Sequence, residues 1–217
     1  MLPGSSYKLG ILTWLSSEAR LVAPFGQVAG GGGGRAGAVL AADRLVRSGA
    51  SALLSFGVAG GLAPDLPAGT LVVPKAVWVA GRRIACDDGL IEWLGGATTE
   101  LIADSPHTVN GVADKQALWR QSGAAAVDLE SGPLALAAEQ AGLRFAVLRA
   151  ICDPAGRSLP SVVQTALNPS GGISVLSLLQ GIIAEPRQIT AIFGLAADAA
   201  RARRSLQAAM ARTSRDG

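Results

Sequence analysis

The chain has 217 residues, of which 49% are apolar and 16% are charged, and its net charge is +3. This length suits one domain with a sizeable core, and the composition excludes general disorder. Aromatic residues make up only 4% of the chain, so a stacking surface for single-stranded nucleic acid is not expected. We therefore expect a single domain over residues 1–217, with no nucleic acid partner.

The two cysteines, Cys86 and Cys152, have neither C-x-x-C spacing nor histidine neighbours. We therefore expect no metal, no cofactor and reduced thiols in the cytoplasm. Residues 8–15 are similar to the apolar core of a short signal peptide, but no cleavage site follows them, and we interpret them as a first strand. No run reaches the roughly 18 apolar residues of a membrane-spanning helix.

Strands and helices alternate along the chain. The predicted strands are 9–15, 51–61, 70–86 with a hairpin bend at Ala80-Gly81-Arg82, 124–129 and 144–151. The predicted helices are 34–49, 114–122 with Asp114 as its cap, 133–141 and a long C-terminal region from about 160 to 212. Continuous apolar strands between helices favour an α/β sheet covered on both faces. The least periodic segment, 87–113, is where we expect active-site loops.

Five consecutive glycines, residues 30–34, precede the first predicted helix in VAGGGGGRAG. Glycine backbone can turn its N–H groups inward, and a helix N-terminus favours anions. Gly31, Gly32 and Arg35 could therefore hold a phosphate or a polarised water. The alternative is a flexible turn, since the run matches no known nucleotide-binding pattern.

Two carboxylates, Asp128 and Glu130, interrupt the small apolar residues of AVDLESGPLALAAE, residues 126–139. They lie where a predicted buried strand passes into a predicted helix. A buried, unpaired carboxylate is costly, so such an acid has a partner, a ligand or a perturbed pKa. The pattern indicates a functional site at this junction.

Three blocks of the chain are SFGVAGGLAPDLPAGTLVVP (55–74), AVDLES (126–131) and FAVLRAICDPA (145–155). In this order they are similar to the motifs G-x-A-G-G-L…G-D/T-L-V-V-P, V-E/D-M-E-x and F-x-x-V-R-x-I-S-D-x-A. These motifs are typical of the purine nucleoside phosphorylase and uridine phosphorylase superfamily, which the chain therefore resembles and which includes nucleosidases acting on methylthioadenosine and S-adenosylhomocysteine. The resemblance spans roughly residues 8–185. It implies a three-layer fold in which helices flank a twisted, mixed central β-sheet.

The resemblance implies roles for three acids. Glu130 matches the acid that accepts hydrogen bonds from the ribose hydroxyls, a task suited to a carboxylate. Asp153 matches the acid that protonates the purine N7, which needs a raised pKa. Glu18 matches the acid that activates water in the nucleosidases.

The other expected site residues surround these acids. Substrate-binding residues implied by the same blocks are Leu129, Asp128, Gly57, Val58, Ala59 and Gly60. Asp128 has an alternative as a structural cap at the strand end. His107, the one histidine, is expected either in the wall around the base or 5′ substituent or as a loop residue, because no serine nucleophile motif accompanies it.

The choice between water and phosphate as the nucleophile is left open by the resemblance, with a slight preference for water. Phosphorylases of this superfamily commonly carry an arginine just before the glycine block, and Ser55 stands there instead. Arg20 or Arg35 could substitute for it. Inorganic phosphate is therefore the only co-substrate to consider.

Within the superfamily the chain most resembles the hopanoid-associated phosphorylases, which release adenine from adenosylhopane in hopanoid biosynthesis. The similar stretches are SEAR (17–20), CDPAGRSLP (152–160) and EPRQITAIFGLA (185–196). Alternatives are a methylthioadenosine/S-adenosylhomocysteine or futalosine nucleosidase, and a nucleoside-binding protein that has lost catalysis. The resemblance also implies a homo-oligomer, a dimer or larger.

The apolar spacing of residues 171–206 predicts two amphipathic helices. These either pack on the core or form a surface for a lipid tail or a bilayer. In the second case Arg201, Arg203, Arg204 and Arg212 would meet anionic headgroups, and the cytoplasmic protein would bind membranes peripherally. The expected substrate is accordingly a small-molecule or lipid-linked purine nucleoside.

Overall fold

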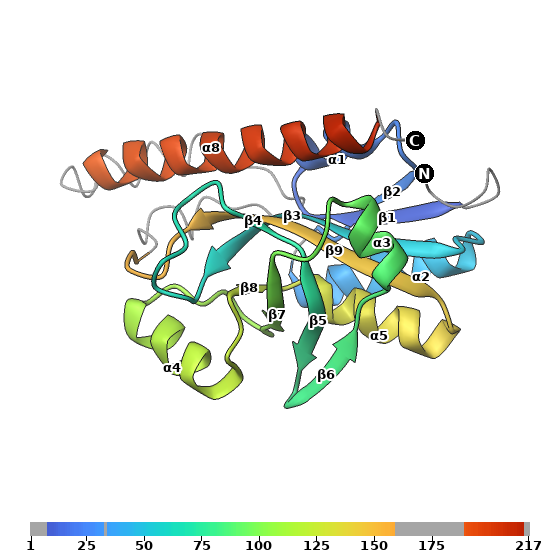
Figure 1. Ribbon diagram of the computed structural model, residues 1–217, viewed down its shortest axis with the longest axis horizontal. Helices are drawn as coiled ribbons and strands as arrows, with labels where there is room; N and C mark the ends of the chain where they lie inside the picture. Colours follow the sequence, from blue (N-terminus) through green and yellow to red (C-terminus); the bar gives the residue numbers. More distant parts are fainter. Residues whose placement is uncertain (1–7, 33, 159–188, 215–217) are drawn as a thin grey trace.

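The computed structural model describes residues 8–32, 34–158 and 189–214. In this part of the chain a nine-stranded mixed sheet lies between helices (Figure 1). The strands are β1 Leu9–Thr13, β2 Gln27–Gly30, β3 Ala52–Gly61, β4 Leu71–Val72, β5 Pro74–Val79, β6 Arg82–Ala85, β7 Thr99–Asp104, β8 Ala126–Asp128 and β9 Arg144–Asp153. The helices are α1 Ser16–Val22, α2 Arg35–Arg47, α3 Asp88–Trp93, α4 Val112–Ser122, α5 Ser131–Ala141 and α8 Ile189–Thr213. The α/β sheet with flanking helices confirms the predicted fold class.

Strands β3 and β9 form the centre of the core. They pair in parallel from Ala52 with Arg144 to Gly60 with Asp153, and nearly every residue in both is buried. Their continuous apolar sequences fit a sheet that is covered on both faces. Figure 1 shows α8 above the sheet and α2 and α5 below it.

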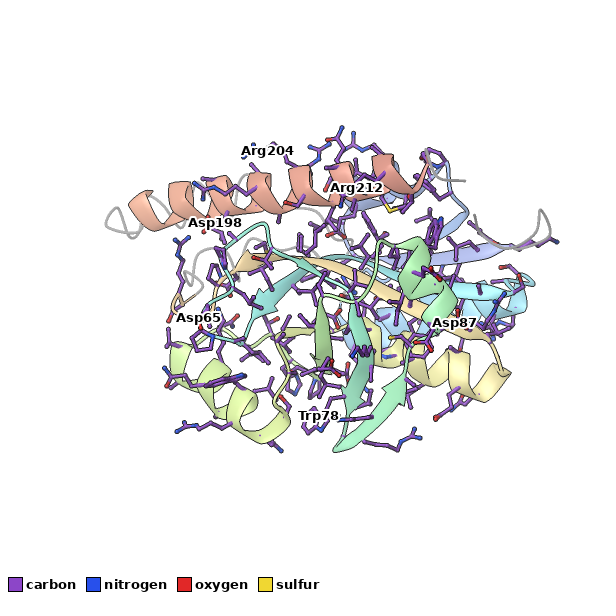
Figure 2. The ribbon with its side chains drawn as sticks, viewed as in Figure 1. Asp65, Trp78, Asp87, Asp198, Arg204 and Arg212 are labelled. Carbon is purple, nitrogen blue, oxygen red and sulfur yellow. The ribbon has the colours of Figure 1, made fainter. Side chains whose placement is uncertain are left out.

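Helix α8 packs on the core through one stripe of its surface. Ala202, Leu206, Ala209 and Met210 are buried, whereas Arg203 and Arg204 on the opposite side are exposed. Figure 2 shows Asp198 on the side toward the sheet and Arg204 on the side away from it. The described part of the predicted C-terminal helices therefore packs on the domain core, and residues 160–188 lie outside the described residues.

The sheet contains a gap beside β3, where a ligand could reach the backbone of this strand. Strand β1 runs parallel to β3 and pairs with residues 52–55, whereas β8 runs antiparallel and pairs only with Gly60 and Gly61. The carboxyl ends of β1 and β8 thus face each other across residues 56–59. Such a change in strand connection leaves backbone groups free, and ligands of α/β proteins commonly bind there.

A β-bulge interrupts β9 where the expected catalytic acid lies. Ile151 pairs with Ala59, but the next pair joins Asp153 to Gly60, so Cys152 is the extra residue. Because side chains alternate along a strand, the extra residue moves Asp153 to the face opposite the one that regular alternation would give it. The bulge therefore sets the direction of this acid.

Several expectations from the sequence need correction. Asp114 does not cap α4: the cap is Gly111, and Asp114 lies in the first turn without a capping hydrogen bond. The segment 87–113 is not mainly loop, because it contains α3 and the internal strand β7. The hairpin bend at Ala80 and Gly81 is confirmed, with φ of 50° and 84°.

The described residues contain no helix long and apolar enough to cross a membrane. The same residues hold no group of three or more histidine, cysteine or acidic side chains that could bind a metal ion. Cys86 and Cys152 are both free thiols. Burial raises the pKa of each thiol to about 12, so both remain protonated at neutral pH.

Candidate active site

Arg149 on β9 is the centre of a buried polar cluster. Its Nε lies 2.6 Å from Asp128 Oδ2, and its Nη2 lies 3.0 Å from Glu130 Oε2. Nη2 also donates to Ser55 Oγ at 2.7 Å. We call Arg149, Glu18, Ser55, Asp128 and Glu130 the Arg149 cluster. A guanidinium suits this place because its fixed fork of donors can serve several acceptors at once.

Gly57 makes room for the Arg149 cluster. It pairs with Arg149 across β3 and β9 and has φ of 151°. A side chain at this position would place its Cβ 2.7 Å from both Arg149 Nη1 and Glu18 Oε1. Only glycine therefore lets the arginine and the glutamate meet above the strand.

Glu18 reaches the gap in the sheet from α1, immediately after β1. Its Oε2 accepts from the N–H groups of Trp14 and Leu15 at 3.2 and 2.8 Å. Its Oε1 accepts at 3.0 Å from the Val58 N–H, which the gap leaves without a strand partner. Burial raises the pKa of Glu18, and these backbone bonds and Arg149 only partly oppose that effect. The result is a fixed carboxylate with unusual affinity for a proton.

Asp128 and Glu130 come from the junction of β8 and α5. Asp128 accepts at 3.0 Å from the Ser131 N–H and also from the Ser131 hydroxyl, at the start of α5, whose N-cap residue is Glu130. Asp128 thus binds the first residue of α5 as well as Arg149. Burial raises the pKa of the fully buried Glu130, and the neighbouring Asp128 and Glu18 raise it further against the influence of Arg149.

Asp104, at the end of β7, is a further buried acid beside this cluster. It pairs with Asp128 in the sheet register, and its carboxylate accepts from the Arg35 guanidinium. Gly132 permits this position, because a Cβ there would overlap the Asp104 carboxyl carbon at 2.1 Å. Burial raises the pKa of Asp104 to about 6.

Asp153 lies at the other side of the β9 bulge and pairs with a buried lysine. Its Oδ2 is 2.5 Å from Lys115 Nζ, and both side chains are almost completely buried. The lysine comes from α4 and also donates to the carbonyls of Pro154 and Arg157. Burial raises the pKa of Asp153, whereas Lys115 is the main group that lowers it.

Some of the unpaired buried polar atoms lie at the carboxyl ends of strands. Among the described residues, buried side-chain atoms without a hydrogen-bond partner include Thr13 Oγ1, Trp14 Nε1, Asp104 Oδ1 and Asp153 Oδ1. They belong to the ends of β1, β7 and β9 and to the residue after β1. Because buried polar atoms are normally paired, these atoms are available to a ligand.

Three of the residues considered for a phosphate or water site, Ser55, Gly31 and Arg35, already have hydrogen-bond partners within the protein. Ser55 is buried inside the Arg149 cluster, where its hydroxyl is already bonded to Arg149 and Ser131. Gly31 and Gly32 follow β2, and the Gly31 N–H donates to the Thr13 carbonyl. Arg35 binds Asp104, and Arg20 is exposed on α1.

Of the expected substrate residues, Gly57, Val58 and Ala59 lie along the gap in the sheet, whereas Gly60 pairs with Val127 at its edge. Leu129 is half-buried between β8 and α5, and His107 is exposed in the loop after β7. Sequence reasoning missed Arg149, Asp104 and Lys115. The signal for Arg149 was present, since it stands inside the quoted FAVLRAICDPA block.

A family model for the phosphorylase superfamily matches residues 27–97 and 98–168, more than half of the 217 residues. The chain belongs to the phosphorylase superfamily. This confirms the resemblance seen in the three sequence blocks, and with it the prediction of an enzyme of the nucleoside phosphorylase and nucleosidase class. Comparison with curated proteins gives no match.

Solved structures share the fold of this phosphorylase superfamily member. The S-adenosylhomocysteine nucleosidase of Streptococcus pyogenes, bound to 5-methylthiotubericidin, is 19% identical with a TM-score of 0.63, and the match covers 89% of this chain and 97% of that one. The 5′-methylthioadenosine/S-adenosylhomocysteine nucleosidase of Neisseria meningitidis, bound to methylthio-immucillin-A, is 18% identical with a TM-score of 0.65, and the match covers 95% and 99%. At these identities the likeness establishes the fold.

Proposed function

We propose that this protein hydrolyses the N-glycosidic bond of an adenosine-type nucleoside and releases adenine. The observation that carries the proposal is the position of Glu18. Its carboxylate is held by three backbone N–H groups beside Arg149, in the gap between β1 and β8. A fixed carboxylate with a raised pKa suits the activation of water.

In the proposed reaction, water adds to the anomeric carbon of the ribose and gives one proton to Glu18. The bond between that carbon and the purine nitrogen breaks, and its electron pair moves into the base. Asp153 supplies a proton to N7, which makes the purine a better leaving group. Removing a group of this kind commonly costs roughly 100- to 10,000-fold in rate.

Glu130 is the proposed ligand of the ribose hydroxyls. Its Oε2 is bound to Arg149, which fixes the carboxylate without consuming all of its lone pairs. Two hydroxyl donors can share the remaining positions. Because the pKa of Glu130 is raised by burial, the ion pair with Arg149 is what favours the charged, hydrogen-bond-accepting form.

Water is proposed over phosphate because the nearby cations already have anionic partners. Arg149 contacts Asp128 and Glu130, and Arg35 contacts Asp104. Glu18 adds a further acid to the same surroundings. An additional anion would meet more buried carboxylates than free cations, so electrostatics disfavour its entry.

Two 5′ substituents fit this proposal. The sequence resemblance of residues 152–160 and 185–196 supports adenosylhopane, a lipid-linked nucleoside. The methylthio ligands named with the solved structures support a small substituent. The apolar residues 173–183 that would favour a lipid lie outside the described residues. The homo-oligomer and the peripheral membrane contact stay predictions.

The test is product analysis with 5′-methylthioadenosine and with adenosylhopane, each in phosphate-free and in phosphate buffer. We expect adenine and a free reducing sugar in both buffers, with adenosylhopane the better substrate. A sugar 1-phosphate that forms only with phosphate would overturn hydrolysis. Absence of adenine from both substrates would overturn the proposed function.

A further inference from the structure

Lys115 is a charged residue in the interior that none of the sequence motifs includes. It lies on the inward side of α4, and its side chain has no exposed surface. Exposed residues surround it in the sequence, including Asp114, Gln116 and Arg120. A buried ammonium is costly unless acceptors replace its water shell, so this lysine requires an explanation.

The acceptors around Lys115 all belong to the segment that ends β9. Nζ donates to Asp153 Oδ2 at 2.5 Å, to the Arg157 carbonyl at 2.8 Å and to the Pro154 carbonyl at 3.1 Å. The Asp153 carbonyl is a more distant fourth acceptor at 3.4 Å. An ammonium has three N–H donors, so its bonding capacity is fully used and its position is fixed.

The two oxygens of Asp153 are therefore not equivalent. Oδ2 is bound to the ammonium, whereas Oδ1 is buried and has no hydrogen-bond partner among the described residues. A carboxyl group whose one oxygen is held by a cation carries an added proton on the other. We propose that Lys115 is a positioning residue, which holds Asp153 Oδ2 so that Oδ1 is the oxygen that exchanges a proton with the purine. This inference rests on the proposed function.

The surroundings of Asp153 support this role for Lys115. The pKa of Asp153 is raised mainly by burial and slightly by Asp198 on α8, and is lowered mainly by Lys115 and less by Arg157. The adjacent Cys152 thiol stays neutral, since burial raises its pKa to about 12. Lys115 is thus the principal group that keeps Asp153 a strong enough acid to give up a proton.

The same lysine also holds the chain after β9 in place. Its bonds to Pro154 and Arg157 close the turn, and Arg157 in turn contacts Asp198 on α8. A purely structural role for Lys115 would use these carbonyl bonds alone. The experiment must therefore separate an effect that acts through the Asp153 carboxylate from an effect on the turn.

A double-mutant cycle makes this separation. The variants are Lys115→Met, Asp153→Asn and the double variant, and the measurement is kcat for adenine release from 5′-methylthioadenosine. We expect Lys115→Met to lower kcat about 10- to 100-fold when Asp153 is present, part of the usual contribution of a general acid. In the Asp153→Asn background the same change is expected to alter kcat less than about twofold. Equal losses in both backgrounds would overturn the proposal.

A second readout needs no turnover. Carbon NMR of the Asp153 carboxyl should show its titration midpoint moving to higher pH in Lys115→Met, because the ammonium that favours the ionised form is gone. An unmoved midpoint would overturn the proposal. Lys115→Gln, which keeps a donor for the carbonyls of Pro154 and Arg157, serves if the methionine variant does not fold.

Arg120→Met is the matched control, since Arg120 is an exposed cation on the same helix. It should leave kcat and the Asp153 midpoint unchanged. The wild-type protein is assayed first. If the wild type releases no adenine, both the proposed function and the role of Lys115 are wrong. If the wild type is active but Lys115→Met lowers kcat equally with and without Asp153, only the role of Lys115 is wrong.

Discussion

Two buried regions along β9, the Arg149 cluster and the pair of Lys115 and Asp153, differ in the balance of their charges. In the Arg149 cluster one guanidinium faces three acids, Glu18, Asp128 and Glu130. Four residues further along the strand, Asp153 meets Lys115 as a one-to-one pair. Both groups of side chains are buried, so solvent exposure does not distinguish them.

The difference in charge balance gives the two regions different proton chemistry. In the Arg149 cluster, burial raises the pKa of both Glu18 and Glu130, and the neighbouring Asp128 and Glu18 raise the pKa of Glu130 further. Where charges are matched, the lysine opposes the effect of burial on Asp153. Strand β9 thus supplies Arg149 to the acid-rich cluster and Asp153 to the matched pair.

Removal of Arg149 should have the largest effect on stability and activity. Arg149→Met leaves three buried acids without their cation, and loss of one partner from a buried ion pair costs about 3–5 kcal/mol. We therefore expect the free energy of unfolding, measured in urea at pH 8, to fall by about this amount. We also expect the variant to lose adenine release.

The pH dependence of that loss identifies its cause. Below about pH 5 the unpaired acids can be protonated, so the loss of stability in Arg149→Met should shrink. Arg47→Met changes an exposed arginine of α2 and should have no comparable effect at either pH. A loss of equal size at pH 5 and pH 8 would show that packing, rather than charge, is the main role of Arg149.

Glu18→Gln should produce the next largest effect, on rate rather than stability. The amide keeps the shape of the side chain but cannot take a proton from water, so hydrolysis should fall roughly 100- to 10,000-fold. The measurement is adenine release from 5′-methylthioadenosine with and without phosphate. Glu92→Gln, at an exposed position of α3, is the control. Phosphate-dependent activity that survives in Glu18→Gln would show that phosphate is the nucleophile.

The sequence predicts the fold better at its centre than at its edges. Strands β3 and β9 are long apolar runs, and their position in the core follows from that pattern. Strand β2 escapes prediction because it is short and leads into the glycine run. Helix α5 begins two residues earlier than expected, at Ser131, whose N–H donates to Asp128, and periodicity alone does not reveal this interaction.

The site is predicted only in part, because some of its residues are paired with residues far away in the sequence. Glu18, Glu130 and Asp153 each stand in a recognisable block, so the resemblance places them. Lys115 belongs to no block, and its partner lies 38 residues away in sequence. The separation of Arg35 and Asp104 is 69 residues, so neither pairing can be inferred from spacing.

Glu130→Gln tests whether the Arg149 cluster binds the ribose hydroxyls. A carboxylate accepts hydrogen bonds from both ribose hydroxyls, and a charged hydrogen bond contributes about 1.5–3 kcal/mol. The variant should therefore lose about 10- to 150-fold in affinity for a riboside and less for the 2′-deoxyriboside. Binding is measured by calorimetry with both nucleosides. Equal losses for both would show that Glu130 does not contact the 2′-hydroxyl, and Glu139→Gln on the exposed part of α5 should change neither.

The smallest predicted effect concerns Asp104, which adds a further acid beside the Arg149 cluster. Burial raises its pKa from the ordinary 3.8 to about 6. The unfolded chain therefore releases this proton near pH 4, whereas the folded protein keeps it until about pH 6. Between these values the folded state binds more protons, so wild-type stability falls as the pH rises through this window. Asparagine has no proton to lose, and Asp104→Asn avoids that fall.

We expect Asp104→Asn to be more stable than the wild type by about 1–2 kcal/mol at pH 8, because Arg35, which loses its partner, is partly exposed and can be hydrated. Below pH 4 the advantage should disappear, since Asp104 is then neutral in both states. Urea unfolding at both pH values measures the difference, and Asp65→Asn, at the exposed position labelled in Figure 2, is the control. A variant that is less stable than the wild type at pH 8 would mean that the ion pair of Arg35 and Asp104 outweighs the cost of burying the acid. The ion pair of Arg35 and Asp104 would then offset the cost of burial, as Lys115 does for Asp153.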